Sequence, residues 1–133
     1  MPTFRVGQAA ELLGVSTDTL RRWADAGRVA TTRSAGGRRQ IDGGALAELA
    51  RSMAAEPPAG GTLSASARNR FTGIVTRVVK DTVMAQVELQ AGPHRIVSLL
   101  SREAVDELGL APGMLAVASI KATTVVVELP AQP

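Results

Sequence analysis

Arginines are concentrated in one short stretch of this 133-residue chain. Six of them lie between Arg21 and Arg39, and Asp25 is the only acidic residue in that stretch. Guanidinium groups bind phosphate oxygens through paired N–H donors and stay charged at any physiological pH. Such a concentration of positive charge is typical of a surface that meets the phosphate backbone of a nucleic acid. The first chemistry that the sequence predicts is therefore the binding of an extended polyanion.

Few other residues could do covalent or metal chemistry. The chain has no cysteine and a single histidine, His94, which follows an expected turn. This composition excludes disulfides, thiol nucleophiles and Cys/His zinc sites, and it fits a reducing cytoplasm. The sequence also lacks a recognisable nucleophile–base pair and a phosphate-binding glycine loop. It therefore favours a binding protein, not an enzyme, with no bound metal cation.

The positive charge belongs to the first half of the chain. Of the net charge of +3, all lies in residues 1–53, which carry eight arginines against five acids, whereas residues 54–133 are balanced. No apolar run approaches the roughly 18 residues that a membrane span needs. Arg5 and Glu11 interrupt the stretch where a signal peptide would be apolar. We therefore expect a cytoplasmic protein without a membrane partner.

The chain is expected to fold as two small domains. Residues 54–62 contain two prolines and two glycines and show no apolar period, which is typical of a flexible linker. Before this segment apolar residues recur with helical spacing, and after it alternation and β-branched residues dominate. The prediction is an α+β multidomain chain, with a mostly α domain over residues 1–53 and a mostly β domain over residues 63–133.

The first domain has the pattern of a helix-turn-helix. Apolar residues from 4 to 13 define one face of a first helix, which Gly14 ends. Ser16 can cap a second helix over residues 17–26, and Gly27 stops it. In this layout the second helix lies in the major groove of DNA, with its N-terminal side chains at the base edges.

A hairpin and a third helix follow. Two β-prone pieces, residues 29–32 and 39–41, flank a glycine pair that allows a tight turn, which predicts an arginine-bearing wing. Asp42 can cap a closing helix over residues 45–53. The side chains expected to contact DNA lie on the second helix and on the wing: Thr17, Asp18, Thr19, Arg21, Arg22, Arg33, Arg38 and Arg39.

Residues 3–52 resemble the winged helix of the MerR-like, excisionase-type family. The motifs that carry the resemblance are AAELLGVS at 9–16, TLRRW at 19–23, Gly27 and GRR at 37–39. The resemblance implies a winged helix-turn-helix that binds double-stranded DNA. In full MerR regulators a long dimerising helix follows, whereas here the helical pattern ends near Met53, so dimerisation must come from elsewhere. An ordinary solvated surface is the alternative, but turn, helix polarity and wing charge all disfavour it.

The second domain is expected to be an antiparallel β structure with one helix. Ser101 can cap that helix, and Gly109 ends it. The strand patterns cover residues 71–79, 83–89, 95–100 and 114–129, the last with a break near Ala122. Four or five strands with a single late helix are typical of an OB-like Greek-key β-barrel.

Residues 63–130 are similar to the Mop, or molbindin, domain of the TOBE group. The motifs that carry the similarity are SARN at 66–69, SLLSREAV at 98–105, LGLAPG at 108–113 and KATTV at 121–125. The similarity implies that the domain binds molybdate or tungstate, as the tetrahedral oxyanion, between subunits. It also implies a homo-oligomer, with a hexamer built as a dimer of trimers as the favoured arrangement.

The similarity also implies which residues hold the oxyanion. They are Ser66, Ala67, Arg68, Ser98, Ser101, Lys121 and Ala122. In the family the positions of Ser66, Arg68 and Lys121 come from one subunit and those of Ser98 and Ser101 from its neighbour. The set suits an anion, because it offers cationic, hydroxyl and backbone N–H donors and no carboxylate. Many relatives carry serine where Ala122 stands, which leaves the backbone donor here. The alternative is a structural barrel in which these residues only cap helices or face solvent.

The two resemblances together imply a DNA-binding transcriptional regulator that responds to molybdate or tungstate. A second hypothesis is a molybdate storage or buffering oligomer with an accessory DNA-binding module. The two differ in whether sequence-selective DNA binding is required.

Overall fold

The structure is a computed structural model that describes residues 2–54 and 66–131. The chain divides into two compact units, Met1–Gly61 and Thr62–Pro133. Each unit has its own hydrophobic core. Apart from residue 54, the linker expected over residues 54–62 lies outside the described residues. Within the described ranges, no helix combines the length and the apolar composition that a membrane crossing needs.

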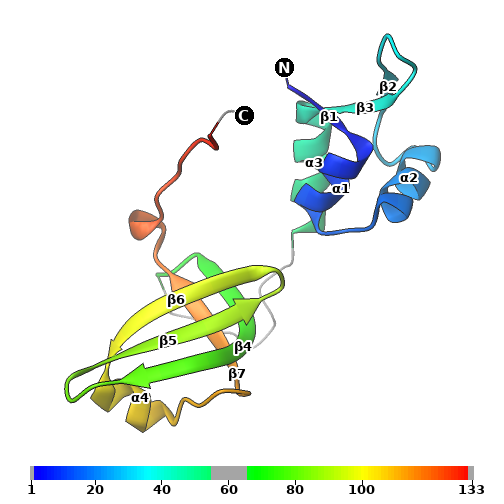
Figure 1. Cartoon of the computed structure of the whole chain (residues 1–133). Coiled ribbons are helices and arrows are strands. Elements are labelled where there is room, and N and C mark those ends of the chain that lie inside the picture. Colours follow the sequence, from blue (N-terminus) through cyan, green and yellow to red (C-terminus); the bar gives the residue numbers. More distant parts are fainter. Residues whose placement is uncertain (1, 55–65, 132–133) are drawn as a thin grey trace. The chain divides into compact units, whose positions relative to one another are not determined.

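The N-terminal unit combines helices with a small antiparallel sheet. Its elements are β1 (Thr3–Arg5), α1 (Val6–Leu13), α2 (Thr17–Asp25), β2 (Thr32–Arg33), β3 (Arg39–Asp42) and α3 (Gly43–Met53). The strand order is β1-β3-β2, and the hairpin between β2 and β3 projects from the unit (Figure 1). This confirms the expected winged helix-turn-helix.

Local sequence signals define the helix-turn-helix. Gly14 ends α1 with a φ of 72°, which glycine adopts without steric cost. Ser16 caps α2, and its side chain accepts a hydrogen bond from the Thr19 backbone N–H at 3.1 Å. The helices enclose an aliphatic core of Val6, Ala9, Ala10, Leu20, Val29, Ile41, Leu46 and Leu49. Burial of this apolar face stabilises the arrangement of α1 and α2.

Three details of the N-terminal unit differ from the predictions. The first strand of the wing is Thr32–Arg33 instead of residues 29–32. Phe4, expected on the first helix, lies in β1 opposite Ile41 of β3, a pairing with a residue far along the chain that local periodicity cannot indicate. The closing helix begins at Gly43, two residues before the predicted start. The Gly43 N–H donates to the Pro2 carbonyl at 2.8 Å, and a Cβ at Gly43 would lie 2.9 Å from that oxygen. The close approach therefore requires glycine at this helix start.

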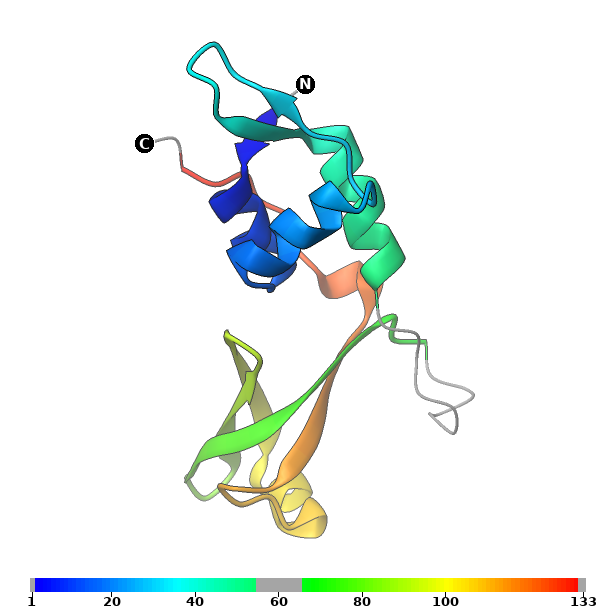
Figure 2. The same cartoon turned by 90° about the vertical axis from the view of Figure 1, so that its right-hand side faces the viewer.

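The C-terminal unit is a four-stranded antiparallel sheet with one α-helix. Its elements are β4 (Asn69–Lys80), β5 (Met84–Ala91), β6 (His94–Ser101), α4 (Arg102–Leu108), β7 (Leu115–Ile120) and the 3-10 helix η1 (Ala122–Thr124). The expected α+β class, with an OB-like second part, is confirmed. The strand order β6-β5-β4-β7 leaves β6 and β7 at opposite edges. In Figure 2, β4 and β7 run together as a long twisted pair.

The core of the C-terminal unit lies on one face of the sheet. It consists of Val75, Ala85, Val87, Leu89 and Val105, the last contributed by α4. A register shift between Val75 and Arg77 marks a β-bulge in β4. Bulges bend a strand and increase its twist, which curves the sheet around this small core.

The last predicted strand is wrong in its second half. The break near Ala122 is confirmed, because β7 ends at Ile120 and η1 follows. Residues 125–129 form no strand, although their β-branched pattern predicted one. Val127 is 87% exposed and Leu129 is 93% exposed, and no strand of the described chain pairs with this segment. A β pattern forms a strand only when it pairs with another strand, and within residues 2–54 and 66–131 none pairs with this segment.

We expect Gly73→Ala to destabilise the C-terminal unit. A Cβ at Gly73 in β4 would lie 2.5 Å from the Gln90 carbonyl oxygen in β5, so paired backbone must move. The cost is about 1–3 kcal/mol in the free energy of unfolding, measured by urea denaturation followed by circular dichroism. Gly7→Ala is the matched control, because a Cβ there meets no atom within 4 Å. Equal stability of the two variants would contradict the close packing at Gly73.

Candidate functional site

The predicted recognition residues lie on α2. Leu20 is fully buried, whereas Asp18, Arg21 and Arg22 are exposed, so the polar side of α2 faces away from the core. The hydroxyl of Thr19 accepts hydrogen bonds from Ser16 Oγ at 2.8 Å and from Arg22 Nη2 at 3.3 Å. Asp18 and Arg21 form a loose ion pair at 3.6 Å. The exposed face of α2 therefore carries an ordered polar array suited to the edges of bases.

Hydrogen bonds across its base and tip hold the wing. The Ser34 N–H donates to the Arg38 carbonyl, and the Gly37 N–H donates to the Ser34 carbonyl, both at 2.8 Å. Gly37 has a φ of 79°, which the tight turn requires. Arg33 Nη1 donates to the Gly37 carbonyl at 2.9 Å. The wing is thus a closed hairpin that presents the exposed side chain of Arg38 at its tip.

An open cleft of about 380 Å³ brings the helix and the wing arginines together. Its lining residues are Arg5, Val6, Gly7, Arg21, Arg33, Gly37, Arg38 and Arg39. No acidic side chain lines the cleft, so its field is positive. Arg5 was not among the predicted DNA-contacting residues, because it joins the cleft through the pairing of β1 with β3, for which the local sequence carries no signal.

Two other side chains of this unit have packing roles. The Arg28 guanidinium lies 4.5 Å from the centre of the Trp23 ring, a cation–π contact that covers the ring. Trp23 packs against the core of the unit. Arg39, predicted to bind DNA, forms an ion pair with Asp25 at 2.7 Å. Its guanidinium is therefore engaged within the unit.

Five of the predicted oxyanion residues lie together in the C-terminal unit. Ser66, Ala67 and Arg68 precede β4 directly, and Lys121 and Ala122 follow β7 directly. Antiparallel pairing joins the two segments, since Asn69 is opposite Ile120 and its side-chain amide donates to the Ile120 carbonyl at 3.1 Å. Ser66, Arg68, Lys121 and Ala122 are exposed. The structure thus places two cations and a hydroxyl at one end of the β4–β7 pair.

The other two predicted residues lie on a different strand. Ser98 is in β6 opposite Val87 of β5, and Ser101 ends β6. The Ser101 hydroxyl accepts a hydrogen bond from the Ala104 N–H at 3.1 Å and so caps α4. Because β6 and β7 are opposite edges of the sheet, no backbone pairing brings this pair beside Arg68 and Lys121. The two groups of donors are therefore not joined by strand pairing, although Ser98 lines the same groove as Ile120, the residue before Lys121.

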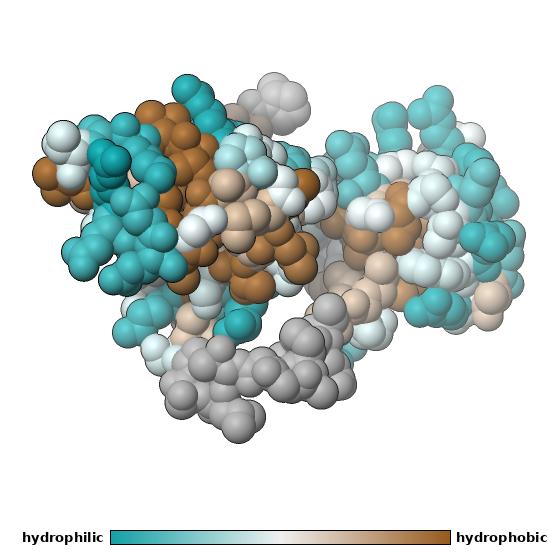
Figure 3. Space-filling model, turned by 90° about the horizontal axis from the view of Figure 1, so that it is seen from below, coloured by the Kyte–Doolittle hydropathy of each residue, from teal (hydrophilic) through white to brown (hydrophobic). Residues whose placement is uncertain are grey.

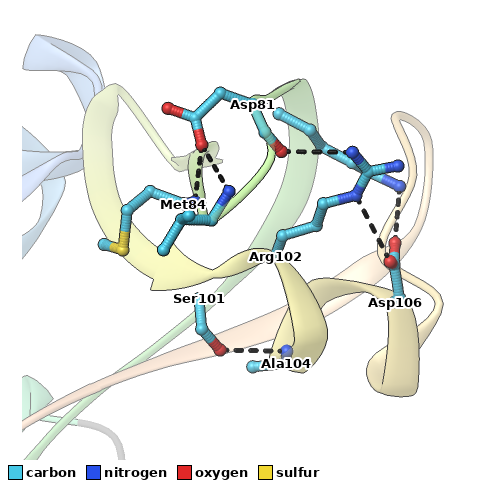
Figure 4. A network of polar contacts seen from close by, with 8 residues as sticks. Asp81, Met84, Ser101, Arg102, Ala104 and Asp106 are labelled. Carbon is cyan, nitrogen blue, oxygen red and sulfur yellow. Dashed lines mark hydrogen bonds and ion pairs between the residues drawn. The ribbon is translucent and has the colours of Figure 1, made fainter.

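A polar network holds the start of α4 where Ser101 lies (Figure 4). Arg102 donates from Nη1 to the Asp81 carbonyl at 3.2 Å, and its Nε lies 3.6 Å from Asp106 Oδ2. Lys80 Nζ reaches Asp106 Oδ1 at 2.8 Å. Backbone N–H groups of the turn lower the pKa of Asp81, and the hydrogen bond from Lys80 lowers the pKa of Asp106. In the folded chain these hydrogen bonds therefore favour the ionised form of both carboxyl groups.

We expect acid to weaken this network. Because the pKa of Asp106 is lower in the folded than in the unfolded chain, its stabilising contribution is present above the ordinary carboxylate pKa of about 4. It is lost as the pH falls through the lower folded value. The melting temperature of the C-terminal unit should therefore fall as the pH is lowered from about 5 through the ordinary carboxylate pKa of about 4 and below. The decrease in melting temperature should be smaller for Asp106→Asn than for the wild-type chain. An equal decline in both proteins would contradict a role for this ion pair.

Large apolar side chains are exposed on the same unit. They include Leu99 of β6, Leu108 of α4, and Leu115 and Val117 of β7. Figure 3 shows the apolar surface of this unit as a brown area across the face turned to the viewer. A groove of about 580 Å³, lined by residues of both edge strands, opens beside it. Contiguous apolar surface of this kind marks an interaction site in soluble proteins.

Two family models match the chain. The model for the MerR family regulatory protein matches residues 5–41, and the TOBE domain model matches residues 65–127. Molybdenum-pterin-binding protein 1 of Clostridium pasteurianum is 39% identical over 66 residues, which are 49% of this chain and 97% of that protein. This chain belongs to the TOBE domain family. The family resemblances inferred from the two sets of sequence motifs are thereby confirmed.

Solved structures also match the TOBE unit. A molybdate binding protein from Sporomusa ovata is 31% identical, with a TM-score of 0.49, over 50% of this chain and all of that one. The cytoplasmic molybdate-binding protein ModG, solved with molybdate bound, is 43% identical, with a TM-score of 0.48, over 50% of this chain and 48% of that one. In the described part of the TOBE and MerR-type units, no cluster of acidic or histidine side chains could hold a metal cation.

Proposed function

We propose that the chain is a DNA-binding transcriptional regulator that responds to molybdate or tungstate. The observation that carries the proposal is the presence of a MerR-type unit and a TOBE unit in one chain. We assign DNA binding to residues 1–53, oxyanion binding to residues 63–133 and the connection between the two to residues 54–62. The MerR family is described as regulatory, and the TOBE relatives are named for binding molybdenum-pterin or molybdate. The chain acts as a binding protein, not as an enzyme, and we propose the cytoplasm as its location.

The geometry of the N-terminal unit supports binding to double-stranded DNA. The exposed face of α2 offers Asp18, Arg21 and Arg22 toward a major groove, with the half-buried Thr17 at the start of the helix. The arginine-lined cleft beside it suits backbone phosphates, which fix the register of a protein on the duplex. Base contacts from α2 and phosphate contacts from the wing are the division of roles that a winged helix-turn-helix requires.

The donor groups of the C-terminal unit support a tetrahedral oxyanion as the ligand. Arg68 and Lys121 supply charge, and Ser66 and the Ala122 backbone N–H supply neutral donors at the same end of the unit. Ser98 and Ser101 lie on the opposite edge strand. We propose that the second group is contributed by a neighbouring subunit, so that the oxyanion binds between two chains.

Homo-oligomerisation through the C-terminal unit agrees with its surface. Both edge strands carry exposed leucines, and residues 125–129 have a β pattern but pair with no strand of the described residues. A second copy can cover such a surface and so gain the free energy of burying it. We propose a hexamer built as a dimer of trimers.

Ligand and DNA binding are then coupled through assembly. An oxyanion held between subunits stabilises the assembled state by about 2.7 kcal/mol when its concentration is a hundredfold above the Kd. Residues 54–62 span at most about 30 Å when extended, so they tether each DNA-binding unit close to the oligomer. Tethering raises the effective concentration at a second half-site, and avidity links molybdate to DNA occupancy.

A molybdate storage or buffering oligomer is the second candidate. It is favoured by the clostridial relative, which matches the TOBE half of this chain over 97% of its own length. Competition of promoter DNA against scrambled DNA in gel shifts with the full chain separates the two. A regulator prefers the promoter by about a thousandfold or more. Equal affinity for both DNAs would leave storage as the better account.

A further inference from the structure

The five arginines of the cleft are not equivalent. Arg39 Nη2 donates to Asp25 Oδ1 at 2.7 Å, and Arg33 Nη1 donates to the Gly37 carbonyl at 2.9 Å. Within the described residues, the side chains of Arg5 and Arg38 form no ion pair, and both are exposed. Arg21 also forms the loose ion pair with Asp18, so three of these guanidinium groups have partners within the unit. Among the described residues, those of Arg5 and Arg38 remain available to a ligand.

The strand register explains why Arg39 needs an acidic partner. Arg33 of β2 lies directly opposite Arg39 of β3. Like charges in directly opposite positions repel each other and destabilise a hairpin. Asp25 forms an ion pair with Arg39, and the Gly37 carbonyl accepts a hydrogen bond from the Arg33 guanidinium. The ion pair offsets the charge of Arg39, whereas the hydrogen bond to the Gly37 carbonyl orients the Arg33 guanidinium and leaves its charge in place.

The Asp25–Arg39 ion pair also joins two parts of the interface. Asp25 is the last residue of α2, and Arg39 is the first residue of β3. The side chain of Arg39 is 30% exposed and that of Asp25 is 64% exposed, so the pair is partly shielded from water. It therefore fixes the base of the wing against the end of the helix that is proposed to enter the major groove.

Arg5 occupies the neighbouring register position. It is the last residue of β1, pairs with Gln40 next to Arg39, and lines the same cleft as Arg21 and Arg38. Because Arg5 lies opposite the residue next to Arg39, its side chain can reach a DNA strand that passes along the wing. Unlike Arg39, it carries a charge that no acid in the described chain neutralises.

We propose that Arg39 is a positioning residue locked to Asp25, and that Arg5 makes a contact with a DNA backbone phosphate. This inference rests on the proposed DNA binding and assigns the residues that perform it. The ligand is a phosphodiester group of a duplex, which a free guanidinium binds through two N–H donors.

The salt dependence of DNA binding separates the two roles. The probe is a random-sequence duplex of about 30 base pairs, bound by the full chain at KCl concentrations from about 50 to 200 mM. Loss of one phosphate contact lowers the slope of log K against log salt by about one. We expect this decrease for Arg5→Ala and for the control Arg38→Ala. For Arg39→Ala we expect an unchanged slope and an affinity about two- to fivefold lower at every salt concentration.

A charge exchange tests the positioning role at constant net charge. If the ion pair only positions the wing, the double variant Asp25→Arg/Arg39→Asp restores the affinity that Arg39→Ala loses. If Arg39 binds a phosphate, the exchange places a carboxylate at that contact and binds worse than Arg39→Ala. Weaker binding by the double variant than by Arg39→Ala would overturn the inference. So would a salt slope that is lower by about one for Arg39→Ala, or a salt slope that is unchanged for Arg5→Ala. Absence of duplex binding by the wild-type chain would overturn the proposed function itself.

Discussion

Arg68→Ala and Lys121→Ala will each weaken molybdate binding by about ten- to a hundredfold, because each removes a charge-assisted hydrogen bond of about 1.5–3 kcal/mol. Both residues lie at the end of the β4–β7 pair, on segments that antiparallel pairing holds together. Both are exposed, so their replacement should leave the unit folded. Isothermal titration calorimetry with molybdate measures the loss, and circular dichroism checks the fold.

The matched control is Arg77→Ala. Arg77 is an exposed arginine of the same strand, β4, but it lies beyond the β-bulge and away from the Asn69 end. Its replacement should leave the Kd for molybdate within about twofold, as expected for a screened surface charge. If either Arg68→Ala or Lys121→Ala binds molybdate with the wild-type Kd, the oxyanion binds elsewhere.

Leu99→Glu should dissociate the oligomer and abolish molybdate binding with it. Leu99 lies in the edge strand β6, between the two predicted ligand residues Ser98 and Ser101, and is 68% exposed in the single chain. A carboxylate buried at a subunit interface without a partner costs several kcal/mol. Native mass spectrometry with and without molybdate measures the subunit number.

Leu12→Glu provides the control for this experiment. Leu12 is 63% exposed and lies on α1 of the N-terminal unit, which is not proposed to associate. Its replacement should leave both the subunit number and the molybdate affinity unchanged. If Leu99→Glu keeps the wild-type subunit number, the β6 edge is not the interface and the shared oxyanion site loses its support.

Elements with local signals could be predicted from the sequence. Gly14, Ser16 and Asp42 end or cap helices through their own backbone or side chains, and Ser101 does the same for α4. These signals act over a few residues, so they are visible without knowledge of the fold. The sequence did not predict β1, because that strand depends on pairing with a segment far along the chain. It wrongly predicted a strand over residues 125–129, because a strand also needs a partner strand.

The candidate sites show the same limit. The positive stretch from Arg21 to Arg39 was evident from composition, but the pairing of Arg39 with Asp25 depends on the packing of the wing against α2. Arg5 joins the cleft only because β1 pairs with β3. The assignment of the oxyanion residues came from family motifs and remains a prediction, since the chain alone brings them together in two groups.

The central claim is that molybdate controls DNA binding, and one titration tests it most directly. The full chain is titrated onto a labelled promoter duplex without ligand, with saturating molybdate or tungstate, and with sulfate as a tetrahedral dianion control. Coupling between two sites is typically about fivefold or more in affinity. We predict a shift of that size with molybdate or tungstate and none with sulfate. Identical DNA affinity in all four conditions would contradict the account.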